Sequence, residues 1–368
     1  MCDTRHDWIT LLAGLSPVVA ALNLTTTLKD ELYYNRSKNM VLQKDAFNLS
    51  SSKPHNDAIA SWLNHLAAMG VGNGYMTKAL TDLTSRNTIG TFCELSAYGA
   101  LLDHNIPFLI QIAQSPSAIL NPNGSDLDGC LQLLGDVFFD VKAFGLQEHL
   151  IDLLVERLQT DLGPSIFVAA EGSKDVSIAT LSDLLGGNSY ATLISELMAN
   201  NIAKRSLLEF RLKPLAIVQM SSGTYDPYRQ AEECADYAFR FAKQFMRHKP
   251  FILVFVMHPW LGGLSLHTNF AGGTDKFLRS FARRTFMQFL RDTKNKHFNL
   301  TRRTVSRLLS GMLVISAWQG KGTDAPTTPP KRLFLNPRAK NPLSPLTVHL
   351  LRAQIRDLEV EDFLHDTY

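Results

Sequence analysis

The sequence predicts a mixed α/β fold in which helices cover both faces of a central sheet. Short apolar segments typical of buried strands, such as Phe251 to Met257, alternate along the chain with longer amphipathic segments typical of helices. Cys130 to Leu134 and Val137 to Ala143 flank Gly135-Asp136, a turn sequence that predicts a hairpin. With 368 residues, 45% of them hydrophobic, the chain can form one large domain or two ordinary ones.

The sequence of residues 1–87 predicts a helical N-terminal region. Apolar periodicity indicates helices over 8–24, 57–69 and 75–83, with a polar loop over 48–56. The apolar part of the first helix has neither a positively charged leader nor a clear cleavage site of small residues, so we interpret it as a buried helix. The apolar run at Phe251 is much shorter than the roughly 20 residues that span a membrane, and no membrane span is predicted.

Residues 88–262 predict the α/β core. A helix over 88–104 carries two neighbouring apolar stripes and places Glu94 near their edge. A loop over 115–129 precedes the hairpin, and an amphipathic helix over 146–160 follows it. Beyond this helix the sequence predicts the following elements: a strand over 166–170, helical structure over 180–200, an extended segment over 207–220, a helix over 226–247 and the buried strand over 251–257.

Residues 263–368 predict a basic, mainly helical C-terminal region. The helix expected over 275–291 presents cations on one face and apolar residues on the other. A segment rich in Pro, Lys and Arg over 326–345 lacks apolar periodicity and predicts an extended arm. A final helix is expected over 346–363.

Charge is distributed unevenly along the chain. Residues 271–340 contain fifteen Lys or Arg and three Asp, a net charge of +12, although the whole chain carries only +3. Phosphate backbones are the commonest partners of such basic segments, so we expect contact with nucleic acid. The candidate contact residues are the cations on the helix over 275–291 and shortly after it: Lys276, Arg279, Arg283, Arg284, Arg291, Arg302 and Arg303.

The second strand of the hairpin carries the candidate chemistry. Residues two apart on a strand point to the same face, so Asp140 and Lys142 project together while Val141 points into the packing. Carboxylates hold Mg²⁺, and a lysine beside them can orient or deprotonate an attacking water and offset charge that develops on phosphate. The pattern therefore favours metal-dependent phosphodiester hydrolysis. One carboxylate cannot hold the metal alone.

Asp128 and Glu94 are the candidates for the other carboxylates. A three-residue turn at 134–136 would pair Asp128 with Lys142 and bring the polar groups to one face, whereas a two-residue turn at Gly135-Asp136 would direct Asp128 away. Asp126 is the alternative to Asp128. Glu94, on the preceding helix, is expected to serve as an outer carboxylate.

The order of these features resembles the PD-(D/E)XK nuclease superfamily, which includes restriction endonucleases. The resemblance covers about 88–170 and consists of a helix with Glu94, then Asp128, the hairpin with Asp140-Val141-Lys142, and a helix that begins near Gln147. It implies a restriction-endonuclease-like core and Mg²⁺ dependence, with Mn²⁺ as a substitute. In it Asp128 and Asp140 are metal ligands, Glu94 is an accessory acid that also contributes to the metal site, and Lys142 lies at the water. Leu127 stands where the superfamily's motif has proline.

The motif and the basic segment together predict a Mg²⁺-dependent endonuclease that acts on DNA, in restriction or another microbial defence role. Double-stranded DNA is the expected partner, RNA stays open, and cutting both strands of a duplex would favour a homodimer or larger assembly. The alternative is a non-catalytic nucleic-acid-binding or assembly protein that retains a nuclease-like fold. The four cysteines form no CxxC pair, which favours a reduced, cytoplasmic location.

Overall fold

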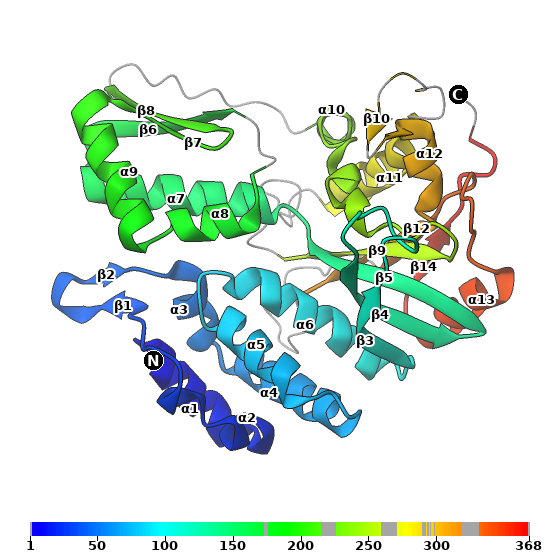
Figure 1. Cartoon of the computed structure of the whole chain (residues 1–368), viewed down its shortest axis with the longest axis horizontal. Coiled ribbons are helices and arrows are strands. Elements are labelled where there is room, and N and C mark those ends of the chain that lie inside the picture. The colour runs from blue at the N-terminus through cyan, green and yellow to red at the C-terminus, as the bar shows by residue number, and fades with distance from the viewer. Residues whose placement is uncertain are drawn as a thin grey trace.

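The computed structural model describes residues 2–172, 176–214, 226–258, 271–288, 292, 294, 296–297, 299–317 and 331–366 (Figure 1). Parts of five sequence predictions fall on residues outside these ranges. They are Arg291 as a nucleic-acid contact, the domain boundary at 262–263, the end of the extended segment at 215–220, the end of the basic helix at 289–291, and the first part of the extended arm at 326–330.

The N-terminal region is helical, as predicted. A small hairpin and two short 3-10 helices interrupt its helices: α1 (Arg5–Leu15), α2 (Pro17–Leu22), η1 (Leu24–Thr26), β1 (Tyr34–Asn35), η2 (Arg36–Lys38), β2 (Met40–Val41), α3 (Lys44–Ser50), α4 (Lys53–Ala68) and α5 (Asn73–Leu83). The helix predicted over 8–24 is divided at Ser16, because Pro17 begins a second helix for which the Ser16 side chain accepts the N–H of Val19. The polar loop predicted over 48–56 is wrong, since α3 and α4 occupy most of it.

The central sheet has seven strands in the order β14-β13-β12-β9-β5-β4-β3. Its strands are β3 (Phe108–Gln114), β4 (Ser125–Leu133), β5 (Gly135–Ala143), β9 (Phe251–Met257), β12 (Gly311–Ser316), β13 (Arg332–Leu335) and β14 (Glu359–Glu361). Strands β3, β4 and β5 form an antiparallel meander, and β5, β9 and β12 run parallel to one another. The predicted mixed α/β fold is therefore confirmed.

Helices cover both faces of this sheet and form two cores. The α6-side core contains Ile252, Val254 and Val256 of β9 and lies beneath α6 (Thr88–Asp103). The α11-side core contains the alternate residues of β9, including Phe255, and lies beneath α11 (Ala271–Met287). Every residue of β9 is buried, which explains its continuous apolar sequence.

A second, smaller sheet lies beside the helices that follow the hairpin (Figure 1). Its strands are β6 (Ile166–Gly172), β7 (Ile202–Arg205) and β8 (Leu208–Pro214), in the order β6-β8-β7. The accompanying helices are α7 (Leu146–Leu162), α8 (Ile178–Leu184) and α9 (Gly187–Asn200). The predicted helix over 146–160 and strand over 166–170 are confirmed within two residues.

The C-terminal region is less helical than predicted. Its helices and those just before it are short apart from α11: α10 (Pro227–Glu233), η4 (Tyr237–Gln244), α12 (Arg302–Leu308) and α13 (Pro345–Gln354), with the small hairpin β10 (Lys296–His297) and β11 (Leu300–Thr301). The expected extended arm contains β13, and the expected final helix ends at Gln354 and is followed by β14. Because β12, β13 and β14 complete the central sheet, this region belongs to the same sheet as the predicted core.

Among the described residues, we find no helix that combines the length and the apolar character needed to cross a bilayer.

Candidate active site

The hairpin that carries the candidate site turns more tightly than either predicted register. Leu133 pairs with Gly135, which leaves Leu134 alone at the tip. Gly135 has φ of +130°, a conformation that favours glycine and permits this sharp reversal. Both predicted turns are therefore wrong, and the expected pairing of Asp128 with Lys142 is displaced by two residues.

The two strands separate beyond the pair Gly129 and Phe139, where the regular ladder ends. At this point Oδ2 of Asp128 accepts a hydrogen bond of 2.7 Å from the backbone N–H of Val141. This side-chain bond replaces the backbone hydrogen bond that a continued ladder would make. Gly129 is required here, because a Cβ at this position would lie 2.4 Å from Cζ of Phe139. The opening of the hairpin thus places the Asp128 carboxylate between β4 and β5.

Backbone irregularity marks the same place in the neighbouring strands. Leu127 and Leu131 are four residues apart and would share a face in a regular strand, yet Leu127 lies in the α11-side core and Leu131 in the α6-side core. On β3, Gln111 has φ of +51°, and its ladder with β4 skips this residue. Such interruptions redirect side chains and are common beside functional sites.

Asp128, Asp140 and Lys142 converge at the opening. Nζ of Lys142 lies 2.5 Å from Oδ2 of Asp140 and 3.9 Å from Oδ2 of Asp128. The Asp140 side chain is fully buried, and its Oδ1 has no hydrogen-bond partner among the described residues. Asp126, the alternative to Asp128, is exposed, and among the described residues it makes no ion pair with Lys142.

Glu94 joins this group from α6, where two tyrosines hold it. The hydroxyl groups of Tyr75 and Tyr98 each lie 3.1 Å from Oε1 of Glu94. The Tyr98 hydroxyl also lies 2.9 Å from the backbone carbonyl oxygen of Asp128, on β4. Because a hydroxyl has one proton, Tyr98 can donate to Glu94 or to this carbonyl, but not to both at once. The sequence analysis did not identify either tyrosine. Tyr98, one helical turn after Glu94, was the one that spacing along α6 could have indicated.

Excess negative charge shapes the protonation of the cluster. Burial, reinforced by the nearby Asp128 carboxylate, raises the pKa of Glu94 to about 7. The same two causes raise the pKa of Asp140 well above its ordinary value. Burial alone would lower the pKa of Lys142, but the neighbouring Asp140 and Asp128 outweigh it and raise this pKa, so the ammonium group stays charged. The cluster therefore contains more carboxylates than its single cation neutralises.

This donor set fits a hard divalent cation in its chemistry. Oδ1 of Asp140 is a buried oxygen without a partner, Asp128 lies beside it, and the carboxylates oppose one another's ionisation. A cation at the opening would relieve that opposition. In the part of the chain that the structure describes, no group of three or more His, Cys, Asp or Glu side chains is arranged to hold a metal ion, and the Lys142 ammonium contacts Asp140.

Gln147 lies on the first turn of α7 and is buried, but its Nε2 lies 3.5 Å from the carbonyl oxygen of Val176. This contact directs Gln147 toward the segment before α8. The structure gives it no contact with the carboxylates.

The predicted nucleic-acid contact residues lie mainly on α11 and α12, and several of them form ion pairs with acidic side chains. Arg279 contacts Glu361 at 2.5 Å and Asp366 at 3.4 Å, and Arg283 contacts Asp366 at 2.5 Å. Glu361 and Asp366, which follow the basic segment 271–340 in the sequence, thus fold back onto it.

The remaining described cations differ in their pairing. Arg284 lies 3.6 Å from Glu232, and Arg302 lies 2.9 Å from Asp236. Lys276 and Arg303 are exposed, and neither has an acidic partner among the residues that the structure describes. The cations of α11 line an open hollow of about 640 Å³, together with the Asp366 carboxylate. They form a basic surface that is only partly neutralised.

Comparisons with protein-family models, with curated proteins and with solved structures find no match to this chain.

Proposed function

We propose that this protein is a Mg²⁺-dependent endonuclease that hydrolyses phosphodiester bonds of DNA. The observation that carries the proposal is the buried charge cluster at the opening of the hairpin. Asp140 is fully buried, and the Lys142 side chain is 18% exposed, between strands whose other side chains are largely apolar. Burying charge costs stability, and a cluster with unbalanced carboxylates and a buried oxygen without a partner is typical of a functional site.

Each member of the cluster has a distinct part in the proposed reaction. Asp128 and Asp140 would hold Mg²⁺, and Glu94 would contribute an outer carboxylate. The bound ion would lower the pKa of water and offset charge on the phosphate. Lys142, kept charged by its neighbours, would orient the attacking water and face the developing negative charge. Tyr75 and Tyr98 would fix the position of Glu94.

The basic surface of α11 and α12 supports nucleic acid as the substrate. Phosphate contacts of this kind depend on charge and do not distinguish DNA from RNA. We propose duplex DNA as the substrate, and RNA is the alternative substrate. A homodimer that brings two sites to one duplex belongs to the same proposal. So do a cytoplasmic location, with which the four free cysteines agree, and a role in restriction or another microbial defence.

Incubation of supercoiled plasmid with purified protein and Mg²⁺ or Mn²⁺ tests this function. We expect the wild type to nick or linearise the plasmid and Lys142→Met to be at least about a hundredfold slower, since removing one transition-state charge contact costs about 3 kcal/mol. Lys53→Met, which removes an exposed lysine on α4, is the matched control and should cleave like the wild type. Equal cleavage by the wild type and the Lys142 variant would contradict the proposed active site. No cleavage with either metal, combined with retained DNA binding, would favour the non-catalytic alternative.

A further inference from the structure

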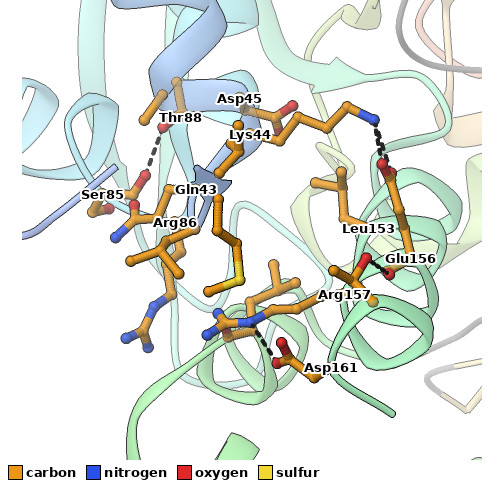
Figure 2. Close-up of a pocket in the computed structure, with 16 residues that line it drawn as sticks. Gln43, Lys44, Asp45, Ser85, Arg86, Thr88, Leu153, Glu156, Arg157 and Asp161 are labelled. Atoms are coloured by element: carbon orange, nitrogen blue, oxygen red, sulfur yellow. Dashed lines mark hydrogen bonds and ion pairs between the residues drawn. The ribbon is translucent and has the colours of Figure 1, made fainter. Parts of the chain in front are cut away.

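A second cavity lies between the N-terminal region and α7, and none of the carboxylate cluster lines it (Figure 2). Its walls are the segment Met40–Ala46, the turn at Arg86 between α5 and α6, and α7 from Leu153 to Asp161. Its volume is about 110 Å³. Cavities of about this size hold small organic molecules, since an engineered apolar cavity of about 150 Å³ binds benzene.

The surface of this α7 cavity is mostly apolar, and charged side chains also line it. Val41, Leu153 and Leu185 are among the apolar lining residues. Among the charged ones, the Lys44 ammonium lies 2.8 Å from both carboxylate oxygens of Glu156 and joins α3 to α7. A ligand with an apolar body and a polar end would match this arrangement.

Arg86 is the cation of the cavity that lacks an acidic partner among the described residues. Lys44 is paired with Glu156, and Arg157 lies 3.9 Å from Asp161. The Arg86 guanidinium is half-buried and packs against Gly186, where a Cβ would lie 2.6 Å from its Nη2. Figure 2 shows the Lys44 and Glu156 pair on one side of the cavity and the guanidinium groups of Arg86 and Arg157 on the other. The lining also contains the Asp45 carboxylate, which lies 2.9 Å from Nε2 of His149. Arg86 is therefore the cation available to an anionic ligand.

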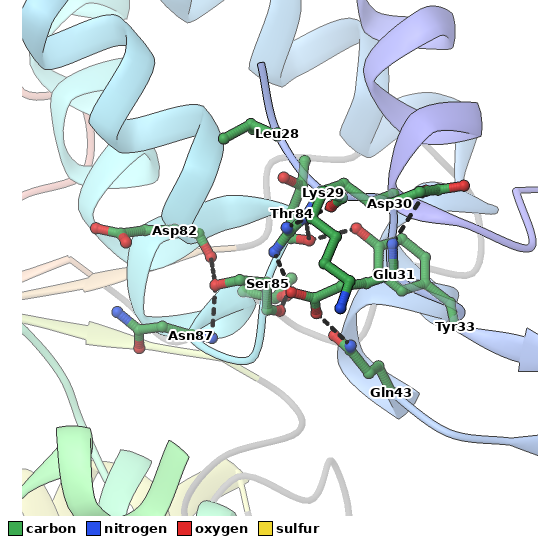
Figure 3. Close-up of polar contacts among 12 residues, drawn as sticks. Leu28, Lys29, Asp30, Glu31, Tyr33, Gln43, Asp82, Thr84, Ser85 and Asn87 are labelled. Carbon is green, nitrogen blue, oxygen red and sulfur yellow. Dashed lines mark hydrogen bonds and ion pairs between the residues drawn. The ribbon is translucent and has the colours of Figure 1, made fainter. Parts of the chain in front are cut away.

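Buried hydrogen bonds hold two walls of the cavity in place before any ligand binds (Figure 3). The Tyr33 hydroxyl donates to the carbonyl oxygen of Thr84, two residues before Arg86. The Arg5 guanidinium donates to the same carbonyl and contacts Glu31 at 2.9 Å. Glu31 in turn accepts a hydrogen bond of 2.8 Å from Nε2 of Gln43, in the wall formed by Met40–Ala46. This network reduces the ordering that binding would otherwise require.

We propose that the α7 cavity binds a small organic anion with an apolar body. The Arg86 guanidinium holds the anionic group, whose planar or tetrahedral oxygens it can meet with two parallel hydrogen bonds. The apolar body lies against Leu153 and Leu185. This site is separate from the carboxylate cluster, and the proposal does not depend on nuclease activity.

Isothermal titration of the full chain with phenyl phosphate, benzoate and inorganic phosphate tests this site. Phenyl phosphate and benzoate together determine whether phosphate or carboxylate is the preferred anion. We expect saturable binding of at least one of them, and binding of inorganic phosphate at least about tenfold weaker because it lacks the apolar body.

Two variants and one control complete the experiment. Arg86→Gln should weaken binding about tenfold or more, as expected for loss of a charged hydrogen bond. Leu153→Phe should also weaken it by filling the apolar end. Arg352→Gln, which alters an exposed arginine on α13 outside the cavity, should bind like the wild type. The proposal is overturned if neither organic anion binds saturably at millimolar concentration, or if Arg86→Gln binds as tightly as the wild type while Arg352→Gln is unchanged.

Discussion

Breaking the pair of Asp140 and Lys142 should destabilise the protein far more than breaking an exposed pair of similar length. The two side chains are 0% and 18% exposed, and 2.5 Å separates the ammonium from Oδ2. Asp140→Leu leaves the Lys142 ammonium buried, with Asp128 at 3.9 Å as its nearest acid. Removal of one partner of a buried ion pair costs about 3–5 kcal/mol in the free energy of unfolding, and Lys142→Met should cost a similar amount.

The double variant separates this coupling from the loss of packing. When both charges are replaced by apolar side chains, no unpaired charge remains, and the double variant should lose about 1 kcal/mol or less. Because each single variant should lose at least about 3 kcal/mol and the double variant about 1 kcal/mol or less, the expected coupling energy is about 5 kcal/mol or more. It is measured by urea denaturation of the four proteins at pH 7.5 with EDTA, followed by circular dichroism.

Lys53 and Asp57 on α4 provide the control cycle. They lie 2.6 Å apart, but their side chains are 80% and 47% exposed, so solvent screens their attraction. A coupling energy of about 0.3–0.5 kcal/mol is expected for such a pair. If the cycle at Asp140 gives a value as small as the control cycle, the charges at the hairpin are not a buried, coupled cluster and our reasoning about the site is refuted.

Three further predictions concern the basic surface, the N-terminal helices and the hairpin. Asp366→Asn should tighten duplex DNA binding about two- to fivefold at low salt by removing the carboxylate that contacts both Arg279 and Arg283, an effect that titrations should not find for Asp362→Asn. Burial lowers the pKa of His55 to about 4, so its neutral form stabilises the protein above pH 6.5 and this stability is lost as the pH falls toward 4. When the pH is lowered from 7.5 to 5, the free energy of unfolding should therefore fall by about 2 kcal/mol less in His55→Asn than in the wild type. Urea denaturation of both proteins at the two pH values measures this difference. Gly129→Ala should lower the melting temperature, because its Cβ would meet the Phe139 ring at 2.4 Å, and an unchanged melting temperature would contradict the packing described.

Local patterns predicted the elements whose packing leaves a clear imprint on the sequence. The helix α6 and the strand β9 were predicted almost to the residue, because one has two apolar stripes and the other is buried on both faces. The hairpin was also predicted, but not its register. A turn with Leu134 alone at its tip depends on the conformation of Gly135, which the residue types alone do not fix.

The missed strand β3 shows where such patterns fail. Its residues do not alternate between buried and exposed positions, and Gln111 interrupts its regular conformation. The sequence therefore lacks the period of two that marks a half-buried strand. The same interruption lies beside the opening at Asp128. The irregular backbone near the candidate site is therefore also the reason that β3 could not be predicted from the sequence.

Contacts distant in sequence could not be predicted from the residues alone. Tyr75 reaches Glu94 from another helix, and Asp366 reaches Arg283 across 83 residues of chain. A charge count identified the basic segment correctly but could not show that nearby acids would cover part of it. Pairing of this kind depends on the packed fold.

The most direct test of the candidate active site is a crystal structure of the protein soaked in Mn²⁺, with anomalous diffraction recorded to locate the metal. We expect an anomalous peak coordinated by carboxylate oxygens of Asp128 and Asp140, and no peak there in Asp140→Asn. Full occupancy of Mn²⁺ elsewhere, with no peak at the opening of the hairpin, would contradict the assignment of this cluster as a metal-dependent active site.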